Sequence, residues 1–363
     1  ANDNLISTIT GSQADDMVGN GGITILSNGN YTINSLIWAN GSPELASAFT
    51  FGNATTGVSG VVSAGNSLIA APYNSLVAPL NNGNYVVLSP YWKNSSSVAV
   101  GSATWCNASG TTVGSISSSN SLVGSTADDR IGYDGIRILP NGNYLVKSSL
   151  WDNGSATDAG AITWCNAAIG LTGLVNSSNS LVGGAVNDKL CSVLFTDGIS
   201  ILSNGNYVVA NPYTDIAGKT DAGSATWGNG TIGISGVVNS SNSLVGTTAN
   251  DQVGKQVAIL SNGNYVVSST LWANGSAAGT WGSGTSGVSG IINSSNSLIG
   301  NAASDQVGYA IPLANGNYVV SSPGFKNGGI TSTGAVTWCS GITGGTGVVS
   351  SLNSLTGVPN NGD

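Results

Sequence analysis

The sequence predicts an all-β protein built as a six-bladed β-propeller from six four-stranded repeats of about 60 residues. Two observations carry this prediction. Short apolar segments with strand character recur through the chain, and one tetrapeptide, Asn-Gly-Asn-Tyr, occurs six times at intervals of 53 to 63 residues. Its copies begin at Asn28, Asn82, Asn141, Asn204, Asn262 and Asn315. Small antiparallel sheets repeated 4 to 8 times around a channel are typical of β-propellers.

The repeats form a single predicted domain over residues 1–363. Their approximate bounds are 8–68, 69–122, 123–181, 182–244, 245–298 and 299–357, followed by a tail at 358–363. Two alternatives stay open: a β-helix or other elongated β array, and a seven-bladed propeller that lacks one blade. In the closed six-bladed ring, "NLIS" near the start is a candidate to pair with the C-terminal segment.

The fifth repeat shows the four predicted strands in order. They are Asp251–Leu260, Asn264–Trp272, Gly279–Gly284 and Ser289–Gly300. Each is a Val-, Ile- or Tyr-rich run bounded by Gly, Asn and Ser, and none has the apolar spacing of a helix. Asn-Gly between the first two predicts a tight hairpin closed by a type I′ turn.

Two columns of aromatic residues follow the repeat. Seven residues after the Tyr stand Trp38, Trp92, Trp151 and Trp272, with Thr214 and Phe325 in the other copies. Twenty residues after it stand Trp105, Trp164, Trp227 and Trp338, with Phe51 matching and Trp281 at sixteen. Large rings at one position per sheet suit packing between sheets. The alternative is a platform for ligands, for which Trp38, Trp92, Trp151 and Trp272 are the candidates.

A carboxylate also recurs once per repeat. The column comprises Asp16, Asp129, Asp188, Asp251 and Asp305, with Ala71 in the second copy. An Asp at one place in many repeats is expected to accept backbone N–H groups in a turn. Two loops hold paired acids, Asp152 with Asp158 and Asp215 with Asp221, which are the candidates for a metal site and equally for Asx-turns.

Several phrases resemble the integrin-α-like FG-GAP propeller repeat. "DQVG" (Asp251 to Gly254) is similar to its first phrase, "LSPYW" (Leu88 to Trp92) and "SSPGF" (Ser321 to Phe325) to its second, and "GAVTW" (Gly334 to Trp338) and "GAITW" (Gly160 to Trp164) to its third. The chain also resembles the NGNYVV and NSLVG repeats of large secreted bacterial surface proteins. Calcium-binding FG-GAP members carry an acidic loop where this chain has Asn-Gly, and Ca²⁺ prefers several carboxylate oxygens. No cofactor is therefore expected, with calcium only a weak alternative.

Composition narrows the function classes. Sixteen Asp or Glu against 8 Lys or Arg give a net charge of −8, which disfavours nucleic acid as a partner. No apolar run is long enough for a membrane helix. The chain has no His, which removes imidazole-based catalysis and most zinc sites. Neither Asp15 with Asp16 nor Asp128 with Asp129 forms a convincing glycosidase pair.

The four Cys residues predict small buried thiols. Cys106, Cys165 and Cys339 share one repeat position, which puts them in different sheets, and a Cys165 to Cys191 bridge is the remaining alternative.

Together these observations predict a non-enzymatic, extracellular module for adhesion or matrix assembly on a bacterial surface. Expected partners are glycans, other surface proteins or further copies of the chain. The alternatives are a lectin-like propeller and, less favoured, a glycoside-active enzyme or a strand-exchanging filament subunit. Function is expected in the loops that differ between copies, Asn40 to Phe49, Lys93 to Val100 and Asp215 to Asp221.

Overall fold

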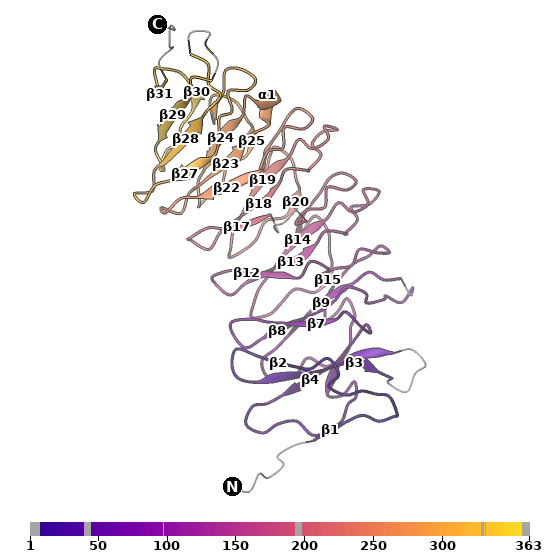
Figure 1. Cartoon of the computed structure of the whole chain (residues 1–363). Helices are drawn as coiled ribbons and strands as arrows, with labels where there is room; N and C mark the ends of the chain where they lie inside the picture. Colours follow the sequence, from indigo (N-terminus) through magenta and orange to yellow (C-terminus); the bar gives the residue numbers. More distant parts are fainter. Residues whose placement is uncertain are drawn as a thin grey trace. The chain divides into compact units, whose positions relative to one another are not determined.

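The computed structural model describes residues 8–39, 45–96, 98–192, 198–327, 330 and 332–357. It divides into two compact units, Ala1–Ser180 and Leu181–Asp363. Both are all-β and contain consecutive sheets of about five strands (Figure 1). The predicted fold class and the six repeats are confirmed, while closure into a propeller ring stays a prediction. "NLIS" and the segment Asn40 to Glu44 lie outside the described residues.

Each repeat begins with three antiparallel strands. The first strands are β2 (Ile23–Ile25), β7 (Leu76–Pro79), β12 (Ile136–Ile138), β17 (Ile199–Ile201), β22 (Gln256–Ile259) and β27 (Ala310–Pro312). The second are β3 (Tyr31–Trp38), β8 (Tyr85–Ser89), β13 (Tyr144–Ser148), β18 (Tyr207–Asn211), β23 (Tyr265–Ser269) and β28 (Tyr318–Ser322). The third are β4 (Ala46–Gly52), β9 (Ser102–Cys106), β14 (Ala161–Cys165), β19 (Ser224–Gly228), β24 (Ala278–Gly282) and β29 (Ala335–Cys339).

Two short strands end each repeat. The fourth are β5 (Gly60–Val61), β10 (Gly114–Ser115), β15 (Gly173–Leu174), β20 (Gly236–Val237), β25 (Gly290–Ile291) and β30 (Gly347–Val348). The fifth are β6 (Ser67–Ala70), β11 (Leu122–Val123), β16 (Ser180–Val182), β21 (Leu244–Val245), β26 (Leu298–Ile299) and β31 (Leu355–Thr356). A further strand, β1 (Ile9–Thr10), precedes the first repeat, and one helical turn, α1 (Trp272–Gly275), follows β23.

The fourth phrase of the repeat is two strands, so its prediction as one strand was wrong. β25 and β26 are separated by a turn and lie in different sheets. The fifth strand pairs antiparallel with the third of its own repeat, whereas the fourth pairs parallel with the fifth strand of the preceding repeat. In the second unit, Gly290 and Ile291 of β25 thus face Leu244 and Val245 of β21. Within each unit, successive repeats are joined by a shared sheet.

The hairpin between the first two strands is also not the predicted type I′ turn. That turn needs positive φ at both central residues. Here Gly29 has φ +87°, while Asn28 is not among the residues with positive φ. The Gly29 N–H donates to the Leu26 carbonyl, and the Asn28 side chain accepts the N–H of Asn30 at 3.1 Å. The loop is a three-residue one with Gly in the left-handed region, held by an Asx-turn.

A side-chain hydrogen bond links the third and fifth strands in all six repeats, and it is buried in the first five and part-buried in the sixth. Thr280 on β24 and Ser297 beside β26 are 2.7 Å apart through their hydroxyl oxygens. The same pair recurs as Thr50 with Ser67, Thr104 with Ser121, Thr163 with Ser180, Thr226 with Ser243 and Thr337 with Ser354. These pairs supply partners for hydroxyls that burial would otherwise leave unsatisfied.

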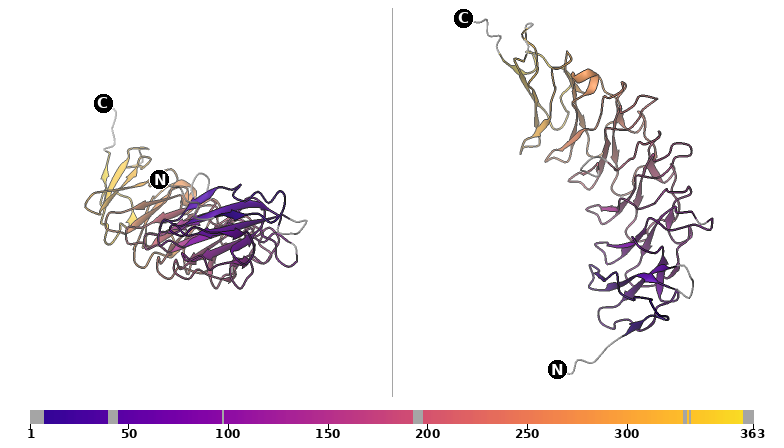
Figure 2. Two further views of the ribbon diagram at one scale, coloured as in Figure 1. Left: turned by 90° about the horizontal axis from the view of Figure 1, so that it is seen from below. Right: turned by 45° about the vertical axis from the view of Figure 1, so that its right-hand side comes forward.

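Neighbouring sheets within a unit pack face to face. In the second unit, the sheets of β22 to β24 and of β27 to β29 follow one another in chain order (Figures 1 and 2). Val266 of β23 and Tyr318 of β28 belong to one apolar cluster between them, and both are fully buried. All five residues of β23 are buried because this sheet is covered on both faces, as in other two-sided sheets.

Candidate functional site

The recurring Asp side chains are tied into turns. Asp129 accepts the N–H groups of Ser125 and Thr126 on Oδ2 at 2.7 Å each, and that of Asp152 on Oδ1 at 3.0 Å. The pattern holds for Asp16, Asp188 and Asp251. Asp305 keeps the Oδ2 bonds, but its Oδ1 is buried without a hydrogen-bond partner in the described residues.

Burial raises the pKa of Asp129 and Asp188, and the backbone N–H groups oppose that rise. A carboxylate with one oxygen engaged by its own turn and the other by a later loop is a structural group. Asp16 and Asp129, the buried members of the two adjacent acidic pairs, are therefore committed to turns rather than to a cleft.

The two loops with paired acids are also closed by a carboxylate that accepts a backbone N–H. Asp152 Oδ1 accepts the N–H of Asp158 at 2.9 Å, and Asp215 Oδ1 accepts that of Asp221 at 2.8 Å. Across the described ranges, no group of three or more Cys, Asp or Glu side chains is arranged to hold a metal ion. In each loop the first Asp accepts an N–H six residues later, a longer span than the two residues of an Asx-turn, so the bond closes the whole loop.

The two aromatic columns have different surroundings. In the first, Trp38 and Trp151 are buried, at 2% and 4% exposure, so they cannot stack on a ligand. Trp92 and Trp272 are half-buried. In the second column Trp105, Trp164, Trp227 and Trp281 are half-buried, whereas Trp338 is 61% exposed.

The half-buried column takes part in a clasp between consecutive repeats. The carbonyl oxygen of Ala167 accepts three N–H groups from the preceding repeat, those of Asn82 Nδ2 at 2.9 Å, Asn84 Nδ2 at 2.8 Å and Trp105 Nε1 at 3.0 Å. The Oδ1 atom of the same Asn84 amide accepts the N–H of Ala108 at 2.8 Å. The backbone of Ala167 is thereby fixed by its own repeat, through Asn143, and by the previous one.

This inter-repeat clasp recurs in the second unit. Gly284 O accepts from Asn204, Asn206 and Trp227. Gly341 O accepts from Asn262, Asn264 and Trp281. Sequence reasoning missed it by assigning Asn-Gly-Asn to a turn alone. The signal was present, because the second Asn recurs in all six copies although the turn does not require it.

A glycine completes the clasp. Gly170, at φ +68°, lies against the Trp105 side chain, and an added Cβ would come within 2.4 Å of Trp105 Cβ. Gly287 and Gly344 face Trp227 and Trp281 in the same way. The indole therefore packs on bare backbone, which sets how closely two repeats approach.

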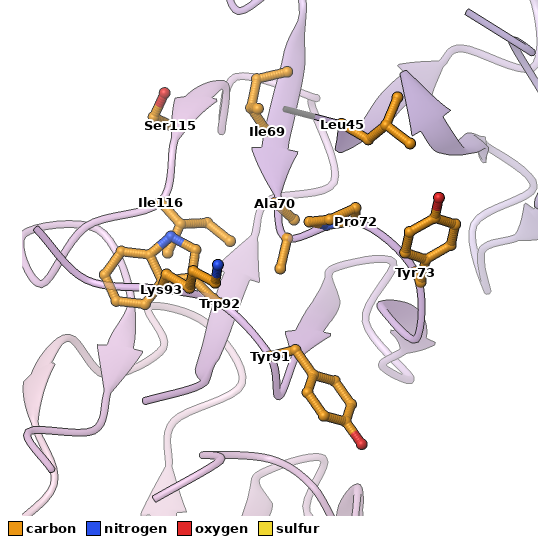
Figure 3. Close-up of a pocket in the computed structure, with 11 residues that line it drawn as sticks. Leu45, Ile69, Ala70, Pro72, Tyr73, Tyr91, Trp92, Lys93, Ser115 and Ile116 are labelled. Atoms are coloured by element: carbon orange, nitrogen blue, oxygen red, sulfur yellow. The ribbon is translucent and has the colours of Figure 1, made fainter. Parts of the chain in front are cut away.

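The first unit also carries a cavity lined by aromatic side chains. It has a volume of about 660 Å³ and is lined by Tyr73, Tyr91, Trp92 and Lys93 among others (Figure 3). Tyr73 is 49% exposed, and Trp92 also lines an adjoining cavity of about 450 Å³. The Arg130 guanidinium lies 4.9 Å from the centre of the Tyr91 ring and is paired with Asp128 at 3.0 Å.

All four Cys residues are buried thiols, so the alternative of a Cys165 to Cys191 bridge was wrong. Cys106 and Cys165 lie opposite Tyr85 and Tyr144 in the sheet register. Burial raises the pKa of both thiols to about 12. Thiols with such pKa values are inert at neutral pH.

The repeats match a known family. A family model described as a repeat of unknown function, DUF5650, matches residues 25–78, 79–133, 138–192, 201–255, 259–309 and 312–363. The chain belongs to this family. Each DUF5650 match begins three residues before an Asn-Gly-Asn-Tyr copy. The resemblance to FG-GAP repeats stays a hypothesis.

Other comparisons add little to the family match. No curated protein matches the DUF5650 chain at a significant level. A solved structure of a luciferin-regenerating enzyme is similar over 86% of each chain, at 11% identity and a TM-score of 0.24. A score this low carries no argument about fold or activity. No helix of the described part of the chain has the length and apolar character to cross a membrane.

Proposed function

We propose that this DUF5650 chain is a non-enzymatic module for adhesion or matrix assembly on a bacterial surface, located outside the cell. The observation that carries the proposal is the use of the recurring polar residues. Each column that might have held catalytic or metal-binding groups is engaged in turns or in the clasp between repeats, as with Asp129 and Asn84. The repeat is thus devoted to building a long, regular scaffold, and binding is left to its variable loops.

The variable loops have a surface suited to neutral polar partners. Lys93 to Val100 and Asp215 to Asp221 sit between the second and third strands of their repeats, where internal hydrogen bonds such as Asn94 to Val98 shape them. Amide and hydroxyl groups of such loops suit glycans, and the net charge of −8 disfavours anionic partners. We also propose that the six repeats close into a propeller ring and that they are related to FG-GAP repeats.

A binding survey tests the proposal. We expect the purified chain to bind glycans or matrix proteins on arrays, and antibodies to detect it on intact cells that produce it. Replacing Asn94→Ala, Ser95→Ala and Ser96→Ala together is expected to reduce binding, whereas the same changes at Asn176, Ser177 and Ser178, in a turn that recurs between repeats, serve as the control. Blank arrays together with purely intracellular staining would contradict the proposal.

One observation favours the lectin-like alternative, namely the aromatic cavity of Figure 3. Pyranose rings stack on exposed aromatic faces, and Tyr73 at 49% exposure presents one at the cavity rim. We expect Tyr73→Ala to weaken oligosaccharide binding measured by calorimetry. Tyr309→Ala, an equally exposed Tyr of the other unit, is the control. Equal binding by both variants would remove the cavity as the site.

A further inference from the structure

The second repeat lacks the Asp turn that precedes the first strand of the other five repeats. In the third repeat, Asp129 accepts the N–H of Asp152 and so ties this turn to the loop after the second strand. In the second repeat Ala71 stands in the Asp column. The segment from Leu68 to Leu80 has 13 residues, against 18 from Leu122 to Leu139 in the third repeat. The carboxylate that closes the third repeat at this point is thus missing from the second.

The cavity of Figure 3 lies between the two segments that the Asp turn ties together in the third repeat. Ala71, Pro72 and Tyr73 of the shortened segment line it on one side. Trp92 and Lys93, which follow β8, line it on the other. The second repeat is therefore open where the third is closed.

A second cavity adjoins the first. Trp92 and Ile116 line both the cavity of about 660 Å³ and the one of about 450 Å³. Both volumes are typical of small-molecule sites. The Trp92 backbone is held in place, because its carbonyl oxygen accepts the N–H groups of Val100 at 2.9 Å and Gly101 at 3.0 Å. We call the two cavities together the second-repeat groove, which has Trp92 at its centre.

The two halves of the groove differ in chemistry. The larger presents aromatic rings, among them Tyr73 and the half-buried Trp92, which lie on opposite sides of Pro72 (Figure 3). The smaller presents hydroxyl and amide groups, those of Asn94, Ser95, Ser117, Ser118 and Ser125. A sugar offers both kinds of surface, since its C–H face packs on aromatic rings and its hydroxyls bond to polar side chains.

Charges near the groove exclude other ligand classes. Lys93 lines the larger cavity, and the Arg130 guanidinium lies 4.9 Å from the centre of the Tyr91 ring. These cations disfavour a quaternary ammonium ligand, which aromatic rings otherwise bind. The net charge of −8 disfavours a polyanion. A neutral ligand fits both conditions.

The groove also differs from that of a glycosidase. Among the described residues that line the two cavities there is no Asp or Glu. Hydrolysis of a glycosidic bond uses a pair of carboxylates on either side of that bond. The lining therefore suits binding without cleavage.

We propose that the second-repeat groove binds a linear, neutral oligosaccharide across at least two consecutive sugar rings. One ring packs on the aromatic side chains of the larger cavity, and the next bonds to the polar groups of the smaller. Because the rings are linked, the second binds at a high effective concentration and raises the affinity. The inference rests on the lectin-like alternative proposed above and adds to it the length and charge of the ligand.

A chain-length series tests the proposal on the full chain. A glycan array carries neutral glucose-, galactose-, mannose- and N-acetylglucosamine-based oligosaccharides and acidic uronate-based ones, each of one to six units. Calorimetry then measures the sugars that bind. We expect affinity to rise about tenfold or more over the first three units and then to level off. The bound oligosaccharide should be recovered uncleaved.

A matched pair of variants separates the two halves of the groove. Ser118→Trp fills the smaller cavity and is expected to abolish the gain in affinity beyond the shortest sugar that binds. Ser177→Trp makes the same change at the matching exposed turn position of the third repeat and is expected to keep the full gain. Circular dichroism confirms that each variant is folded.

Each contrary outcome overturns a stated part of the proposal. Affinity independent of chain length, or a gain that Ser118→Trp leaves intact, would overturn the two-ring groove, while loss of binding in Tyr73→Ala would still support the lectin-like site. Preference for the acidic sugars would overturn the neutral ligand. Binding to no sugar on the array would overturn both the groove and the lectin-like alternative.

Discussion

The Asn84 side chain donates from Nδ2 to the carbonyl oxygen of Ala167, 2.8 Å away in the following repeat. The same amide accepts the N–H of Ala108 in its own repeat. One side chain thus holds two repeats in register, and the tetrapeptide that makes the chain repetitive is also what couples its repeats.

The clasp predicts a difference between two equivalent Asn residues. Asn264 accepts the N–H of Gly284 and donates to Gly341 O, while Asn317 accepts the N–H of Gly341 in the same turn of the last repeat. We expect Asn264→Ala to lower the free energy of unfolding by about 1 kcal/mol more than Asn317→Ala, since one hydrogen bond between repeats is lost in addition. Urea denaturation measures both, and equal losses would show that the clasp contributes nothing.

The close contact between Gly170 and Trp105 predicts a steric effect. Gly170→Ala is expected to cost about 2 to 4 kcal/mol, because the new Cβ must displace the Trp105 side chain and the residue is at positive φ. Gly154→Ala is matched in φ, at +64°, but has open space around its Cβ, so it is expected to cost only about 1 kcal/mol. Comparable losses in thermal unfolding would assign the whole effect to backbone strain.

Adjacent carboxylates at positions 128 and 129 are expected to differ in importance. Asp129→Asn replaces an oxygen that accepts two N–H groups with an amide donor, at an expected cost of about 2 to 4 kcal/mol. Asp128→Asn removes an exposed ion pair with Arg130 and is expected to cost less than about 1 kcal/mol. Calorimetric midpoints test the ranking, which a reversed order would refute.

Buried thiols predict a loss of stability at alkaline pH. Burial raises the pKa of Cys106 and Cys165 to about 12 and that of Cys339 to about 11, from an ordinary 9.0. As pH rises, the thiols of the unfolded chain ionise before those of the folded chain. The contribution of the buried thiols to the free energy of unfolding is therefore complete below about pH 9 and is lost as pH rises toward about 12. Denaturation at several pH values should show the decline, and Cys165→Ala should reduce its slope.

The same thiols should resist modification. We expect a disulfide reagent at pH 8 to label none of the four buried Cys residues in the native chain and all four in denaturant. Rapid native labelling would mean that these sites open readily.

Much of the local structure could be predicted from the sequence. The runs after each Asn-Gly-Asn-Tyr copy form strands, and the fold is all-β with six repeats. These features depend on contacts near in sequence, where β-branched runs and Gly-containing turns restrict the backbone. Asp129 Oδ2 accepts N–H groups from three and four residues back, so this half of its environment is also local.

The linkage between repeats depended on tertiary structure. The division of the fourth phrase into two strands could not be predicted, because β25 has only two residues, too few to show a strand period. Its residue Gly290 pairs with Leu244, which lies 46 positions earlier in the sequence. The role of Asn84 was hidden for the same reason, since its acceptor Ala167 is 83 residues away. The sequence by itself therefore determined the first three strands of each repeat, the position of the hairpin between the first two, and the number of repeats. Only the packing of sheet on sheet decided which edges pair, which Trp rings are covered and which donors meet a distant carbonyl.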